Sequence, residues 1–175
     1  MNQDNYSFFK RIALIIVLII ILLIAVFFYY MFTIEKDFEA TFDQSKAKVI
    51  EETDLKNISS MHSYQEEELF HIFIGKSNSN EDLISVVHLD KDKKITSEKI
   101  KTFKSVDYIS EESMLDKWAE TCNQCDLIKI QAAYTDDFLL WEITYNDIDN
   151  RYVFDYYLMT DGKQFEELKL NRNFN

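Results

Sequence analysis

An uninterrupted apolar run near the N-terminus constrains this chain more than any other feature. The 21 residues from Ile12 to Phe32 carry no charge. As a helix rising ~1.5 Å per residue they span about 31 Å, the thickness of one bilayer core. We therefore predict a transmembrane helix over 12–32 that contacts the lipid bilayer, preceded by a tail of residues 1–11.

The charges beside the apolar run predict its orientation. Lys10 and Arg11 precede the run, which favours a cytoplasmic N-terminus and extracellular C-terminal domains on a single-pass protein of the cell membrane. A cleaved signal peptide is the alternative, but its apolar run has about 7–15 residues and ends in small residues. This run is longer and ends in aromatic residues at 27–30, which favours a retained anchor.

The exported part of the chain is acidic. The whole chain has 19 basic and 31 acidic residues, a formal charge of −12. Beyond the N-terminal tail, 17 basic and 30 acidic residues remain, a charge of −13. Such a surface repels phosphate backbones, so we expect no nucleic-acid partner. With two Gly and no Pro, no glycine-rich loop for phosphates or oxyanions is readable, and we expect no cofactor.

After the anchor, the order of helix and strands occurs twice. Residue spacing predicts one helix over 35–55 and a second over 110–119. Ser110 is placed to cap the N-terminus of the second helix. The predicted strands cover 69–74, 83–89, 127–134, 138–145, 152–159 and 163–170, with a turn at 90–94. A shift of about 70 residues places Ile58 on Ile128 and Tyr64 on Tyr134 without a gap, so we predict two structural repeats.

Three stretches make the chain resemble the YpmB/TseB-like cell-wall elongation regulators of Gram-positive bacteria. They are Glu52-Thr-Asp-Leu55, Leu140-Trp-Glu-Ile-Thr-Tyr145 and Tyr156-Tyr-Leu-Met-Thr-Asp-Gly-Lys163. The resemblance implies an α+β protein with two tandem PepSY-like, cystatin-like modules after the anchor. Each would be a helix packed on an antiparallel sheet, the first over 33–105 with the juxtamembrane helix and the second over 106–175.

The same resemblance implies a function without catalysis. It implies a non-enzymatic extracellular protein that binds and regulates the elongation machinery, with a class B penicillin-binding protein as the expected partner. It implies no set of functional residues. The PepSY likeness also leaves open a second interpretation, a protease-inhibitor or peptide-binding module.

Two cysteines offer an enzymatic alternative. Cys122 and Cys125 have the spacing of a redox motif, which would suit an extracellular thiol-disulfide oxidoreductase. Such motifs begin a helix, whose dipole lowers the thiol pKa, whereas this pair follows the end of the predicted helix. We interpret the pair as structural, either a disulfide or two partly buried thiols. The sequence shows no pattern of four zinc ligands, so we expect no metal site.

The remaining polar candidates also have simple structural interpretations. His62, His71 and His88 fall in or beside predicted strands, and we expect each on a strand surface. Acidic clusters at 66–68, 136–137 and 147–149 could suggest paired catalytic carboxylates, but they fall where turns are predicted. We therefore predict that the chain is not an enzyme.

Aromatic residues crowd two predicted strands of the second module. Alternation sends Trp141 and Tyr145 to one face of their strand, and that face is a candidate to cover the helix. On the next strand Tyr152, Phe154 and Tyr156 share a face. Because tyrosine-rich surfaces are enriched at protein interfaces, these three residues are the candidate partner-binding surface.

Overall fold

The computed structural model describes residues 3–65, 68–90, 95, 99–135 and 137–171. The predicted acidic turn residues Glu66, Glu67 and Asp136, and most of the predicted turn at 90–94, lie outside the described residues. The chain divides into two compact units, Met1–Asp43 and Gln44–Asn175.

One long helix, α1 (Gln3–Glu52), runs through the first unit and enters the second. Its segment Lys10–Thr33 is long and apolar enough to cross a membrane once, and the segment is exposed along its length. The predicted span at 12–32 lies inside this segment. Neither Gly nor Pro occurs within α1, so nothing in its sequence breaks the helix between the apolar run and Glu52.

The helix ends at Glu52, three residues before the predicted boundary at Leu55. The Thr53 hydroxyl donates to the Val49 carbonyl at 2.8 Å and accepts from the Leu55 N–H at 3.1 Å. This hydroxyl satisfies backbone groups on both sides of the exit, so the chain turns directly into a strand. Val49 and Leu55 are fully buried on the two sides of the turn.

The first sheet has four antiparallel strands in the order β1-β2-β3-β4. They are β1 (Leu55–Gln65), β2 (Leu69–Ser77), β3 (Asp82–Leu89) and β4 (Ile100–Lys104). The sequence predicted β2 and β3, which are rich in buried apolar residues, and did not predict β1 and β4. Both missed strands are edge strands with many polar residues, so their apolar signal is weak.

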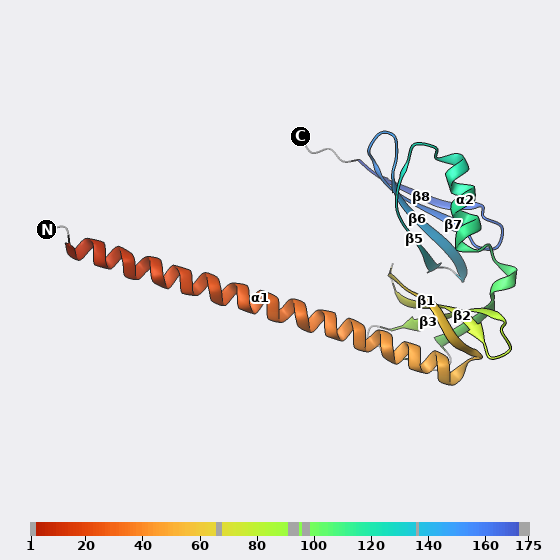
Figure 1. Ribbon diagram of the computed structural model, residues 1–175, viewed down its shortest axis with the longest axis horizontal. Coiled ribbons are helices and arrows are strands. Elements are labelled where there is room, and N and C mark those ends of the chain that lie inside the picture. Colours follow the sequence, from red (N-terminus) through yellow and green to blue (C-terminus); the bar gives the residue numbers. More distant parts are fainter. Residues whose placement is uncertain (1–2, 66–67, 91–94, 96–98, 136, 172–175) are drawn as a thin grey trace. The chain divides into compact units, whose positions relative to one another are not determined.

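The second module repeats this arrangement after η2 (Ser105–Asp107) and α2 (Glu111–Thr121). Its strands are β5 (Asp126–Thr135), β6 (Phe138–Asn146), β7 (Tyr152–Leu158) and β8 (Gln164–Leu170), antiparallel and in sequence order. Ser110 caps α2 as predicted, because its Oγ accepts from the Ser113 N–H at 3.2 Å. The predicted α+β class, with an apolar N-terminal helix and two antiparallel sheets, is confirmed (Figure 1).

The two sheets belong to one unit and share one hydrophobic core. Tyr64, Ile72 and Val86 of the first sheet join a cluster that includes Trp118 of α2 and Leu140 of β6. At its border, the rings of Phe70 and Tyr134 lie 5.1 Å apart. Lys101 donates to the Tyr134 hydroxyl at 3.1 Å and to Asp137, and the bond to Asp137 raises the Lys101 pKa to about 12.

Candidate binding face

The two faces of the second sheet have different environments. Trp141 and Tyr145 of β6 lie on the face that packs against α2, which we call the helix face. The rings of Tyr145 and Trp118 are 5.2 Å apart, and the Trp141 Nε1–H donates to the Ile109 carbonyl at 2.8 Å. Strand alternation and register place Leu140, Glu142 and Thr144 on the opposite face, which we call the outer face.

The three predicted surface residues lie together on the outer face. Tyr152, Phe154 and Tyr156 are paired across β6 with Asn146, Thr144 and Glu142, which lie opposite the helix face. Each is half-buried, and the rings of Tyr152 and Phe154 meet at 5.1 Å in a T-shaped contact. Their role in partner binding stays a proposal.

Cross-strand rows organise the outer face. Register places Glu142, Tyr156 and Glu166 side by side on β6, β7 and β8. The next row along the strands is Thr144, Phe154 and Leu168. A polar row that contains two carboxylates and a tyrosine therefore lies beside an apolar row, and Leu168 leaves 45% of its surface exposed.

Glu142 is a buried carboxylate, only 4% exposed. Its Oε2 accepts from the Tyr156 hydroxyl at 3.1 Å, and its Oε1 accepts from Gln131 Nε2 at 3.0 Å and pairs with Lys129 Nζ at 3.2 Å. These partners offset the cost of removing the charge from water. Burial, followed by the charge of Glu142, raises the Tyr156 pKa, so that hydroxyl stays protonated and remains a donor.

A groove of about 560 Å³ lies between the outer face and the end of β1. Tyr64 of β1 forms one wall, and its ring meets that of Tyr156 at 6.4 Å in a T-shaped contact. Phe165 of β8 lines the groove and packs against Phe138, with ring centroids 6.0 Å apart. Because Phe138 is 47% and Phe165 40% exposed, this part of the face presents large apolar surface to solvent.

Sequence reasoning missed several residues of this groove, namely Tyr64, Glu142, Phe165, Glu166 and Leu168. One signal could have found Glu142, because it is the single acidic residue in a largely apolar strand. The contribution of β1 had no comparable signal. It depends on the packing of the first sheet against the second, which residue spacing within one strand does not encode.

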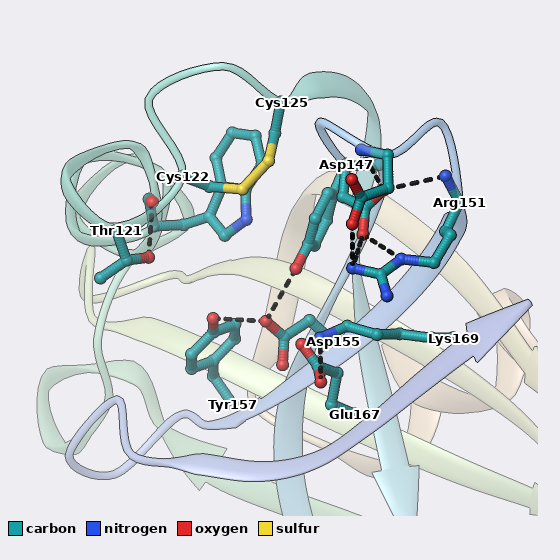
Figure 2. The surroundings of a disulfide bond; sticks show 12 residues. Thr121, Cys122, Cys125, Asp147, Arg151, Asp155, Tyr157, Glu167 and Lys169 are labelled. Carbon is teal, nitrogen blue, oxygen red and sulfur yellow. Dashed lines mark hydrogen bonds and ion pairs between the residues drawn. A yellow bond between two sulfur atoms is a disulfide. The ribbon is translucent and has the colours of Figure 1, made fainter.

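Cys122 and Cys125 form a disulfide, with their Cα atoms 5.5 Å apart (Figure 2). Cys122 is the C-terminal cap of α2, and its backbone N–H donates to the Trp118 carbonyl at 3.0 Å. The pair therefore lies at the carboxyl end of the helix, as predicted, where the dipole opposes thiolate formation. Arg151 lines the adjacent cavity of about 350 Å³ but forms an ion pair with Asp147 at 2.7 Å.

A buried acidic group lies on the helix face of the same sheet (Figure 2). Asp155 is 3% exposed and accepts from the Tyr157 hydroxyl at 2.6 Å and from Gln164 Nε2 at 2.8 Å. Burial raises the Asp155 pKa. Burial, with the charge of Asp155 second, raises the Tyr145 pKa to about 12. This network is satisfied within the sheet and needs no ligand.

His71 lies in the interior, so the prediction of a surface position is wrong for this residue. Its side chain is fully buried on the face of β2 toward α1, and its Nδ1 lies 2.7 Å from the Ser45 hydroxyl. Burial lowers the His71 pKa to about 4, so the imidazole is neutral at physiological pH. His62 and His88 are half-buried.

The acidic cluster at 147–149 forms a turn, as predicted. Asp147 accepts from the backbone N–H groups of Asp149 at 3.0 Å and Arg151 at 2.9 Å. Across the part of the chain that the structure describes, no group of three or more His, Cys, Asp or Glu residues is arranged to hold a metal ion. Among the sites described above, the outer face combines a groove with exposed aromatic and aliphatic side chains.

Comparison with known proteins bears on the fold. No model of a known protein family matches this chain, and no curated protein matches its sequence. Among solved structures, the chain is similar to the YpmB protein from Bacillus subtilis, with a TM-score of 0.61 and 23% identity. The match covers 73% of this chain and 95% of that one. The predicted resemblance to YpmB is therefore confirmed in the fold.

Proposed function

We propose that this chain is a non-enzymatic, membrane-anchored extracellular protein that binds and regulates the cell-wall elongation machinery. Its proposed partner is a class B penicillin-binding protein, and its two sheet modules are proposed to be PepSY-like. The observation that carries the proposal is the outer face of the second sheet, where aromatic and apolar side chains border a groove on a protein with the YpmB fold.

The apolar helix supports the location. Lys10–Thr33 has the length and composition of one membrane span, and Lys10 and Arg11 at its N-terminal end favour a cytoplasmic tail. An anchor confines the modules to the membrane surface, where a partner in the same membrane is present at high effective concentration. A modest contact area is then sufficient for binding.

Binding without catalysis is supported by how the reactive side chains are used. The cysteines form a disulfide at a helix C-terminus, and His71 is buried against Ser45. Glu142 is held by four side chains of the sheet, those of Lys129, Gln131, Thr144 and Tyr156. Each group has a structural role, which favours a binding module over an oxidoreductase or a hydrolase.

Photocrosslinking in cells tests the proposed function. A photoreactive amino acid at Leu170, which is 56% exposed beside Tyr152 on the outer face, should capture a class B penicillin-binding protein. The matched control places the same amino acid at Glu112, an exposed position on α2. Equal capture from both positions would place the contact elsewhere. Absence of any wall-synthesis protein, under conditions that capture known neighbours, would overturn the proposal.

Two alternatives have separate readouts. Disulfide-exchange activity of the purified chain, together with a strongly lowered thiol pKa after reduction, would favour the oxidoreductase. Tight inhibition of a cell-surface protease, with no wall synthase captured, would favour the inhibitor or peptide-binding module.

A further inference from the structure

The free edge of the second sheet adjoins the groove. β8 is the last strand of that sheet, and within the described residues it pairs with β7 alone. All seven of its residues are exposed. The outward N–H and C=O groups of an edge strand can pair with an added extended chain.

The apolar side chains of β8 favour such an added strand. Leu168 is paired with Phe154 and Leu170 with Tyr152, so each leucine extends its own cross-strand row toward the edge. They are 45% and 56% exposed. Because side chains alternate along a strand, every second residue of an added segment would share the outer face and lie beside Glu166, Leu168 and Leu170 in turn.

The neighbouring row offers a site for a positive charge. Glu166 of β8 is exposed and has no cation partner among the described residues, whereas the Glu142 charge is offset by Lys129. Tyr156 lies between the two carboxylates, and its hydroxyl is fixed by Glu142. Neighbouring strands are about 4.8 Å apart, so a cation over the Tyr156 ring reaches the Glu166 carboxylate.

We infer that β8 and the groove bind an extended segment of the partner protein by strand addition, with a lysine or arginine side chain of that segment seated between Tyr156 and Glu166. Apolar side chains at alternating positions of the segment pack beside Leu168 and Leu170. This inference rests on the outer face being the partner-binding surface of the proposed function, and it specifies the chemistry of the partner.

Peptide selection tests the inference without assuming which protein is the partner. The full chain in lipid nanodiscs is used to select from a phage-displayed library of random peptides, and the selected peptides are synthesised. We expect them to carry a lysine or arginine flanked at alternate positions by apolar residues. Replacing the cation by glutamine in the peptide should weaken binding about fivefold to tenfold.

A double-mutant cycle locates the cation. The variant Glu166→Gln should weaken binding of the parent peptide by a similar factor, and the peptide without its cation should bind both proteins equally. Glu112→Gln removes a carboxylate that is also exposed, but on α2, and should leave binding unchanged. Circular dichroism and thermal unfolding of each variant report whether the fold is retained.

Several results would overturn the inference. One is the selection of acidic peptides or of no peptides. Another is a cycle in which the effects of Glu166→Gln and of the peptide substitution on affinity are additive. Binding of cell-wall oligosaccharides at Tyr156 in place of peptides would assign the groove to a glycan. A dimer in sedimentation experiments that Leu170→Asp dissociates would assign the edge to a second copy of this chain.

The inference and the proposed function fail in different ways. If the extracellular part of the class B penicillin-binding protein binds wild type and Glu166→Gln with equal affinity, the inference fails and the proposed function stands. If selected basic peptides bind as expected but that protein does not bind, the proposed partner fails and the chemistry of the groove stands.

Discussion

Lowering the pH should destabilise the fold through one buried histidine. His71 is fully buried beside Ser45, and its pKa falls from 6.5 in the unfolded chain to about 4 in the folded protein. Between these values the unfolded chain binds the proton and the folded protein does not. The free energy of unfolding therefore decreases as the pH drops from 6.5 toward 4. Above 6.5 the histidine is neutral in both states, so it contributes no pH dependence.

The size of the effect follows from the pKa difference. This pKa difference corresponds to roughly 3 kcal/mol across the whole window. At pH 5 the loss should be about 2 kcal/mol relative to pH 7.5. His71 has no exposed surface, so solvent does not reduce this value.

Urea unfolding of the full chain in detergent micelles measures the effect. Trp118 and Trp141 lie in the shared core and report unfolding by fluorescence, with circular dichroism in parallel. The variant His71→Asn keeps a hydrogen-bonding group near Ser45 and removes the titration. Between pH 7.5 and 5, the free energy of unfolding of this variant should decrease by about 2 kcal/mol less than that of the wild type.

A second variant separates titration from packing. Ser45→Ala removes the hydroxyl at 2.7 Å from His71 but leaves the imidazole in place, so it should lower stability while keeping the pH dependence. Equal pH dependence in wild type and His71→Asn would refute the reasoning, because all other titrating groups are common to both proteins.

Three further perturbations have expected outcomes. Gly75→Ala should lower the free energy of unfolding by about 2–3 kcal/mol, because a Cβ there would meet the backbone of β1, including Ile58 Cα at 2.8 Å. Urea unfolding measures the change, and unchanged stability would contradict this packing. Ser110→Ala should cost about 1 kcal/mol through loss of the α2 cap, and Ser110→Asp should retain most of it. Replacing Cys122 and Cys125 by serine should lower the free energy of unfolding by no more than about 2 kcal/mol, the value for a disulfide that closes a loop this short. The variant should still capture the partner in the crosslinking experiment. Loss of capture from a folded variant would favour the thiol mechanism.

Local patterns in the sequence determined much of this fold. The uncharged run 12–32 can satisfy its backbone in lipid only as a helix, and Ser110 before an apolar periodicity specifies where α2 begins. The alternation in 152–157 sorted the aromatic side chains between two faces because the side chains of a strand point alternately to opposite sides. These features depend on neighbours within a few residues.

Such local patterns did not predict the edge strands or which polar residues are buried. Within the described residues β1 and β4 are the edge strands of the first sheet, and most of their side chains are exposed or half-buried, so they carry few apolar signals in the sequence. His71 is buried because α1 brings Ser45 against β2, across 26 residues of chain.

The amino-acid sequence by itself determined an apolar N-terminal helix, an acidic composition beyond it, two helix-plus-sheet repeats and a face shared by Tyr152, Phe154 and Tyr156. Only the tertiary structure decided that Tyr64 of the first sheet forms a wall over that face and that Glu142 and Glu166 flank Tyr156. The physical reason is that periodicity specifies which side of a strand a residue occupies. What lies opposite that side depends on packing between strands far apart in the chain.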